Sequence, residues 1–163
     1  MATLAVGAPT QAAPVHAAPS QTASNQAASE RAAPPPSPER AALNVWPGER
    51  TYRSVAVYGR RLVPGTRLIL SFGPPEATNP DAGRVGGNAG CNNMFGRGHI
   101  AGGRLLVPLL ASTRMYCEGR MAQEQWYSNL LTGRPTIRII SGDRLVLRQG
   151  RRLTVVFVAV ATR

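Results

Sequence analysis

Two cysteines, Cys91 and Cys117, carry the most distinctive chemistry in this sequence and make up its whole thiol content. An even pair of cysteines in a small domain is compatible with one disulfide, which forms and persists in an oxidising compartment. On the loop-entropy model, closing a loop between these two positions stabilises a fold by about 3–4 kcal/mol. The alternative is a pair of buried, reduced thiols in a cytosolic protein.

Other residues suited to catalysis or metal binding do not combine into a site. His99 is the single histidine after residue 45 and has no partner at a useful spacing, so we expect it at the surface or in a turn. One histidine, two cysteines and scattered acids give no metal-ligand spacing. Residues 86–90 are rich in glycine, but no lysine follows them as in a phosphate loop. We therefore expect no metal, no cofactor, no catalytic residues and no enzymatic activity.

The net charge of +11 comes entirely from arginine, because the chain contains no lysine. Two arginines and two acids lie before residue 46 and cancel, so the whole excess belongs to the rest of the chain. These arginines are dispersed, whereas basic nucleic-acid patches cluster and interleave with stacking aromatics. A solvated basic surface is the favoured interpretation, and attraction to anionic lipid or polysaccharide is an intermediate one.

Composition divides the chain into two parts. Residues 1–45 are rich in alanine and proline and contain no Ile, Phe, Tyr or Trp, so we expect a disordered tail. Its small residues suit a signal-peptide cleavage site, but it lacks a positively charged start, so it is a signal-peptide remnant or a mature linker. No stretch is long and apolar enough to span a membrane. Residues 46–163 are long enough for one domain.

Short strands separated by turn residues dominate this second part. The expected strands cover residues 51–57, 67–72, 84–88, 94–100, 104–108, 136–140, 144–148 and 152–160. Between the second and third of these, the Pro, Asn and Gly content predicts a loop from Gly73 to Gly83. The last strand is apolar on both faces, so we place it centrally in the sheet.

The segment from Glu118 to Thr132 departs from the β pattern and predicts one α-helix. Ala122, Trp126 and Leu130 recur at intervals of four and form an apolar stripe. Gly133 is placed to adopt the left-handed conformation that ends many helices. The elements together predict an α+β fold, in which a mostly antiparallel β meander curves into a half-barrel with one α-helix packed on it.

Two segments have the composition of tight corners. In residues 87–93 and Gly96, glycine permits positive φ and asparagine tolerates it. Residues 111–117 lie directly before the expected helix. If the two cysteines pair, the disulfide ties the first segment to the entrance of the helix. On physical grounds, both segments are structural motifs.

These segments resemble the META (HslJ-like) domain family. The family pattern is Gly-x-x-Gly-Cys-Asn-x-x-x-Gly, a Leu-bearing strand, a segment like Ala-Ser-Thr-Arg-Met-x-Cys, and a helix that contains Glu. The matching residues are Gly87, Gly90, Cys91, Asn92, Gly96, Leu105, Thr113, Arg114, Met115, Cys117 and Glu124. The resemblance covers residues 50–158.

The resemblance implies an exported protein that is periplasmic, secreted or lipid-anchored. One family member is associated with heat shock and novobiocin resistance, which implies a structural or binding module linked to envelope stress or antibiotic tolerance. The implied partner is an unknown envelope protein or a lipid.

The sequence leaves three functions open. The first is an envelope binding module, since an incompletely filled small barrel holds one ligand. The residues that would line its cavity are Leu68, Leu70, Trp126 and Phe157, with the favoured alternative that they form the core. The second is a basic small barrel that binds nucleic acid. The third, ranked last, is a thiol-redox enzyme, because reactive cysteine pairs usually sit close together at a helix start.

Overall fold

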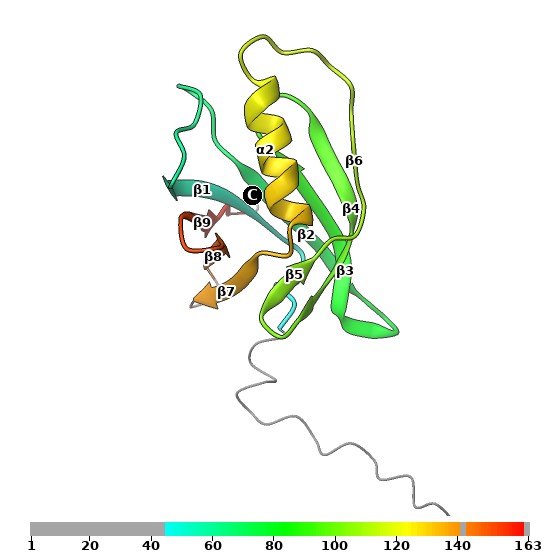
Figure 1. The fold of residues 1–163 in the computed structure, drawn as a ribbon. Coiled ribbons are helices and arrows are strands. Elements are labelled where there is room, and N and C mark those ends of the chain that lie inside the picture. Colours follow the sequence, from blue (N-terminus) through cyan, green and yellow to red (C-terminus); the bar gives the residue numbers. More distant parts are fainter. Residues whose placement is uncertain (1–44, 141–142, 162–163) are drawn as a thin grey trace, which may run out of the picture. The chain divides into compact units, whose positions relative to one another are not determined.

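The computed structural model describes residues 45–140 and 143–161 (Figure 1). The tail expected over residues 1–45 lies outside the described residues except for Val45, and its disorder stays a prediction. Within the described part, one antiparallel sheet of nine strands is joined by one α-helix, α2 (Met121–Thr132). The strands are β1 (Arg50–Tyr58), β2 (Ile69–Glu76), β3 (Asn79–Asn88), β4 (Asn93–Ala101), β5 (Arg104–Leu106), β6 (Leu110–Ser112), β7 (Thr136–Ile140), β8 (Arg144–Gln149) and β9 (Leu153–Ala159).

The sheet curves into a ring. Its strand order is β3-β2-β1-β9-β8-β7-β5-β4-β6, and a further pairing joins β3 to β4. The contact between β5 and β7 is narrow, with Arg104 opposite Thr136 and the Leu105 N–H donating to the Pro135 carbonyl at 3.0 Å. The ring is therefore not a regular barrel, and α2 packs against it (Figure 1). The predicted α+β class, an antiparallel sheet curved around one helix, is confirmed.

Alternation along the strands decides which face is buried. In β8, Leu145 and Leu147 are buried, whereas Arg144 and Arg148 are exposed. Strand β9 pairs with β1 on one side and with β8 on the other, the central place that its two apolar faces predicted. The largest fully buried core side chains are Tyr52, Leu68, Leu70, Val85, Leu105, Val107, Tyr127, Leu130, Leu131, Leu145, Leu147 and Phe157.

The helix buries a different face from the one that the apolar spacing predicted. Its buried residues are Gln123, Glu124, Tyr127, Leu130 and Leu131. Ala122 is exposed, and Trp126 is half-buried with the Arg60 guanidinium 5.6 Å from its ring centroid. The predicted stripe is wrong at Ala122 and only half buried at Trp126, because polar Gln123 and Glu124 turn inward and find hydrogen-bond partners there.

The helix ends at Thr132 as predicted, but its first residue and the conformation of Gly133 differ from the prediction. Helix α2 begins at Met121, later than the predicted Glu118, after a turn in which Gly119 has a φ of 71°. At the other end, Gly133 has a φ of −78°, and the left-handed conformation falls on Arg134, with a φ of 56°.

The proline-rich stretch predicted as a loop is instead the end of a β-hairpin. Strand β2 continues to Glu76 and β3 begins at Asn79, so the predicted loop from Gly73 to Gly83 is wrong. The register of the two strands shifts between Phe72 and Pro75. Proline is tolerated at such an irregularity because no ladder hydrogen bond needs its missing N–H.

The strand predicted over residues 104–108 is shorter than expected. Strand β5 ends at Leu106, and a separate short strand, β6, follows at Leu110–Ser112. Both pair with β4, with Leu106 opposite His99 and Leu110 opposite Gly96. The sequence pattern did not predict β6.

Candidate functional site

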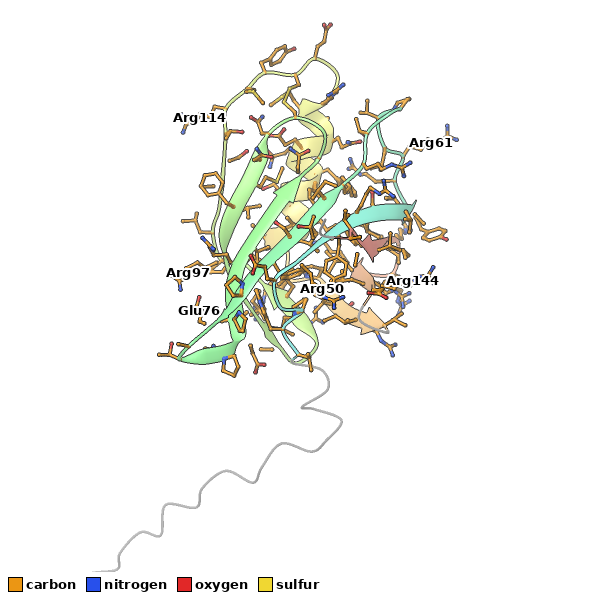
Figure 2. All side chains as sticks on the ribbon, turned by 180° about the vertical axis from the view of Figure 1, so that it is seen from behind. Arg50, Arg61, Glu76, Arg97, Arg114 and Arg144 are labelled. Atoms are coloured by element: carbon orange, nitrogen blue, oxygen red, sulfur yellow. A yellow bond between two sulfur atoms is a disulfide. The ribbon has the colours of Figure 1, made fainter. Side chains whose placement is uncertain are left out.

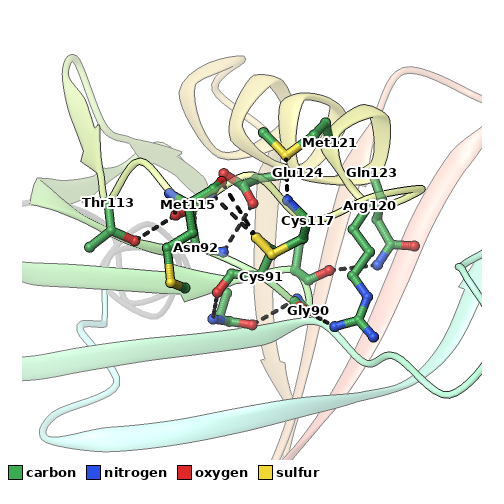
Figure 3. The surroundings of a disulfide bond; sticks show 12 residues. Gly90, Cys91, Asn92, Thr113, Met115, Cys117, Arg120, Met121, Gln123 and Glu124 are labelled. Atoms are coloured by element: carbon green, nitrogen blue, oxygen red, sulfur yellow. Dashed lines mark hydrogen bonds between the residues drawn. A yellow bond between two sulfur atoms is a disulfide. The ribbon is translucent and has the colours of Figure 1, made fainter.

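A disulfide joins Cys91, in the turn between β3 and β4, to Cys117, just before α2 (Figure 3). The two Cα atoms lie 6.0 Å apart across a sequence separation of 26 residues, a Cα distance usual for disulfides. The bond ties the glycine-rich corner, defined here as residues 88–93, to the segment that leads into the helix. Both cysteines are half-buried.

Asn92 is the centre of the hydrogen bonding in this corner. Its side chain is nearly inaccessible, with 1% of the residue exposed. Its Oδ1 accepts hydrogen bonds from the Thr113 hydroxyl at 2.8 Å and from the Met115 N–H at 2.7 Å. Its Nδ2 donates to the Met115 carbonyl at 2.8 Å. The amide thus pairs with the Met115 backbone as a neighbouring strand would, and it fixes residues 113–115 beside the corner.

Two polar side chains of α2 reach into the same corner. Glu124, with 7% of the residue exposed, accepts a hydrogen bond on Oε2 from the Asn92 N–H at 3.0 Å. The Gln123 amide donates to the Ala89 carbonyl at 2.7 Å and accepts from the Val63 N–H at 2.6 Å. Buried polar groups are stable only when bonded in this way. These bonds explain why a helix with a polar inner face packs on the sheet.

Two glycines of the motif let neighbouring side chains pack directly against the backbone. Gly90 has a φ of 100°, and a Cβ on it would lie 2.9 Å from Thr66 Cγ2. A Cβ on Gly87 would lie 3.0 Å from Leu131 and 3.2 Å from Tyr127, both on α2. The helix therefore packs directly on the backbone of β3.

The remaining motif residues divide into buried and exposed ones. Gly96 lies in β4 beside the Leu109 carbonyl, where a Cβ would collide with that oxygen. Thr113 accepts a hydrogen bond on Oγ1 from the Asn93 N–H at 3.1 Å. Arg114 and the Met115 side chain are exposed. The motif brings together Cys91, Asn92, Thr113, Cys117 and Glu124 as a structural unit, while Arg114 and the Met115 side chain project from it.

The residues predicted to line a ligand cavity lie elsewhere. Leu68, Leu70 and Phe157 are fully buried members of the core, and Trp126 packs against that core from the helix. None of the four lines the open groove described below. The structure therefore places them where the alternative interpretation did, in the core.

Tyr127 is the most deeply buried ionisable group on the helix. Its hydroxyl donates to the Ile69 carbonyl at 2.8 Å. Loss of hydration raises the pKa of this phenol well above its usual range. Burial also raises the pKa of Tyr52, although the nearby Arg50 acts in the opposite direction.

No metal-binding cluster is found among the described residues. His99 lies within β4 opposite Ala82 and Leu106 and is half-buried, so it is neither in a turn nor fully exposed. No group of three or more His, Cys, Asp or Glu side chains in the described ranges is arranged to hold a metal ion. No described helix is long and apolar enough to cross a membrane.

An open groove of about 1100 Å³ lies on the outer face of strands β1 to β4 and β6. The strand register places Thr51, Ser71, Gly86, Phe95 and Ala111 in one row across these five strands, and all of them line the groove. The strand neighbours of Ser71 and Gly86 are buried, as is Met94 beside Phe95, so by alternation this row faces outward. Because Ser71 and Gly86 in the middle of the row have small side chains or none, the backbone of β2 and β3 forms the floor of the groove.

Apolar and cationic side chains border this floor. Phe95 and Leu109 are 54% and 76% exposed. Arg84 lies opposite Arg97 in the pairing of β3 with β4, and both line the groove. Arg97 is neutralised by Glu76, with Nε donating to Oε1 at 3.0 Å (Figure 2). Arg84 makes no ion pair with any acid in the described part of the chain.

The META domain family model matches residues 42–162, which is most of the chain. The chain belongs to the META domain family. The resemblance found in the two corner motifs is thereby confirmed, and the matched region extends beyond residues 50–158 at both ends. In this META domain, the motif residues form the corner that the disulfide ties to the helix.

Solved structures of the same fold come from two NMR studies. A protein from Burkholderia xenovorans is 23% identical, with a TM-score of 0.56, over 82% of this chain and 96% of that one. A second protein is 20% identical, with a TM-score of 0.51, over 68% of this chain and 88% of that one. Identities this low show a shared fold alone. No curated protein matches the chain significantly.

Proposed function

We propose that this META domain is a non-enzymatic binding module of the cell envelope, outside the cytoplasm. The groove over β1 to β4 and β6 is its binding site, and an extended peptide segment of an envelope partner is its ligand. The observation that carries the proposal is the groove itself, with its volume of about 1100 Å³ and its exposed apolar border. Monomeric proteins rarely expose such a surface without an interaction to cover it.

The disulfide supports both the location and the binding role. A structural disulfide is stable in oxidising compartments outside the cytoplasm. Strands β3 and β4 form the centre of the groove, and their connecting turn is the glycine-rich corner. The disulfide, together with the bonds of Asn92 and Glu124, therefore holds this hairpin on the helix. A ligand site gains affinity when its walls are fixed before binding.

The lining chemistry favours a peptide with apolar and acidic side chains. Phe95 and Leu109 offer apolar contact, and the unpaired Arg84 offers a cation to a carboxylate. The interior of the ring is filled by core side chains, so the groove lies open on the outer surface. An extended peptide tolerates such a site because its backbone remains hydrated, whereas an acyl chain favours an enclosed one.

The groove offers little for catalysis. Its described lining contains Ser and Thr hydroxyls but no imidazole to activate them as a general base, and no thiol nucleophile. This composition supports binding without turnover. A role in envelope stress or antibiotic tolerance is part of the same proposal, and it rests on the family resemblance alone.

A charge-reversal titration tests the groove. Fluorescent peptides of about ten residues, alternating Leu with Asp or Leu with Lys, are titrated by anisotropy against the full chain. We expect the acidic peptide to bind preferentially, Leu109→Ser to weaken its binding about tenfold, and Arg84→Glu to reverse the preference toward the basic peptide. Arg138→Glu, on β7, makes the same charge change outside the groove and is the matched control.

Two results contradict the proposal. One is the absence of binding by either peptide to the folded protein at millimolar concentration. The other is equal weakening by Arg84→Glu and Arg138→Glu, which would show that only net charge attracts the peptide.

A further inference from the structure

A second surface lies on the other side of the ring, on the outer face of β7, β8 and β9. Arg138 lies opposite Val146 in the pairing of β7 with β8. Arg144 and Arg148 flank Val146 two residues away on β8, so their side chains leave the sheet on the same face. The three arginines and Val146 are named the arginine face here. Figure 2 shows Arg144 across the domain from Arg97, which borders the groove.

No acidic side chain balances the arginine face within the described residues. The outward positions of β7, β8 and β9 hold Thr, Arg, Ile and Val, and none is acidic. Asp143, at the start of β8, is engaged by Arg50, whose Nη1 lies 3.2 Å from Oδ1. Cross-strand neighbours of like charge repel each other. An anionic surface laid over the three guanidinium groups removes that repulsion.

Apolar side chains separate the arginines. Val156 and Val158 of β9 are half-buried on the same face, opposite Val146 and Arg144. Ile140 is 45% exposed. Tyr58, the last residue of β1, lies opposite Thr154 of β9 and is 61% exposed. Arginine interleaved with valine, isoleucine and a tyrosine matches the boundary between lipid headgroups and acyl chains.

We propose that the arginine face docks the domain on the surface of an anionic lipid bilayer. Each arginine close to such a surface gains electrostatic attraction, and the valines and Ile140 enter the headgroup region. Nucleic acid is the other polyanion that this charge attracts, but single-stranded binding uses several stacking aromatics, and Tyr58 is the one aromatic residue described on this face. The proposal is independent of the groove, because none of the three arginines and neither Val146 nor Tyr58 lines it.

Vesicle binding with matched arginine variants tests this assignment. The full chain, with its disulfide intact, is sedimented with vesicles of phosphatidylcholine that contain about one-third phosphatidylglycerol, or none. We expect partition into the anionic vesicles only, weakening steeply between about 50 mM and 500 mM salt. The triple variant R138Q/R144Q/R148Q is expected to lower the partition coefficient about 100-fold.

The control variant R61Q/R67Q/R114Q removes the same charge from exposed arginines elsewhere on the domain. We expect it to lower partition less than about threefold, because these side chains lie off the arginine face. Unfolding midpoints of both variants establish that they are folded. A single-stranded DNA of about 20 nucleotides is titrated in parallel.

Three outcomes overturn the assignment. The first is the absence of binding to anionic vesicles at low salt, and the second is an equal loss of vesicle binding in the two triple variants. The third is DNA binding that R138Q/R144Q/R148Q weakens while the same variant leaves vesicle binding unchanged.

Discussion

The Asn92 amide carries most of the hydrogen bonding between the glycine-rich corner and residues 113–115, so Asn92→Ala is the sharpest perturbation of the corner. The substitution removes three side-chain hydrogen bonds of 2.7 to 2.8 Å at a site where 1% of the residue is exposed. Each such bond contributes about 1 kcal/mol net, and unpaired partners add a desolvation cost. Because Met115 is 56% exposed, water replaces part of the hydrogen bonding that its backbone loses, which lowers the desolvation cost. We therefore expect a loss of about 2–4 kcal/mol in the free energy of unfolding.

The assay is equilibrium unfolding in urea with the disulfide intact, followed by Trp fluorescence and far-UV circular dichroism. A loss of this size is a large part of the total stability of a small domain, which is about 5–15 kcal/mol. The adjacent Asn93→Ala is the matched control, because Asn93 is exposed and, among the residues that the structure describes, its side chain bonds only to Asn88, at 2.9 Å. We expect it to cost less than about 1 kcal/mol. Equal losses in the two variants, or a loss below about 1 kcal/mol for Asn92→Ala, would refute the role given to the amide.

Three further predictions concern the disulfide, a glycine and the buried Tyr127. Removing both cysteines in C91A/C117A should lower the free energy of unfolding by about 3.5 kcal/mol on the loop-entropy model, and urea curves of the reduced wild-type protein should show a similar loss. Gly90→Ala should cost about 1–3 kcal/mol because the new Cβ lies 2.9 Å from Thr66 at a φ of 100°, whereas Gly65→Ala, at a φ of 76° with no atom within 4 Å, should cost less. Because burial raises the pKa of Tyr127 above its unfolded value of 10.0, its contribution to stability is complete below about pH 10 and is lost as the pH rises further, by about 1.4 kcal/mol per pH unit. Urea midpoints measured up to about pH 11 should therefore fall less steeply in Tyr127→Phe than in the wild type, and identical slopes would contradict the assignment.

The strands that alternate cleanly were predictable from the sequence, and those that depend on tertiary contacts were not. Leu145 and Leu147 alternate with arginines, so their strand and its buried face followed from the pattern. Strand β6 has three residues and is defined by its pairing with β4, which no local signal reveals. Pro75 marked a loop in the sequence but lies at a register shift that a hairpin accommodates.

The corner was predictable in composition but not in its contacts. The glycine and asparagine content indicated a tight turn, which pairing of the two cysteines would tie to the helix entrance, and the disulfide joins these segments. The inward orientation of Gln123 and Glu124 was not predictable from apolar periodicity. A prediction from periodicity assumes that buried positions hold apolar residues. These two polar side chains are buried because they form hydrogen bonds to the Ala89 carbonyl and the Asn92 N–H.

The groove was missed because no single segment encodes it. Its row takes one residue from each of five strands, among them Ser71, Gly86 and Phe95. These three residues lie in strands that the sequence predicted, but the order and register in which those strands pair were not predictable. Their common function as a floor appears only when the register places them side by side.

The state of the two cysteines in native protein is the most direct test of a disulfide-tied module that works outside the cytoplasm. Protein is taken from its natural cells, with N-ethylmaleimide present at lysis, and its intact mass is measured before and after reduction. We predict no adduct before reduction, a mass two hydrogens below that of the dithiol, and an adduct on both Cys91 and Cys117 after reduction. Folded protein that carries both adducts without reduction would contradict it.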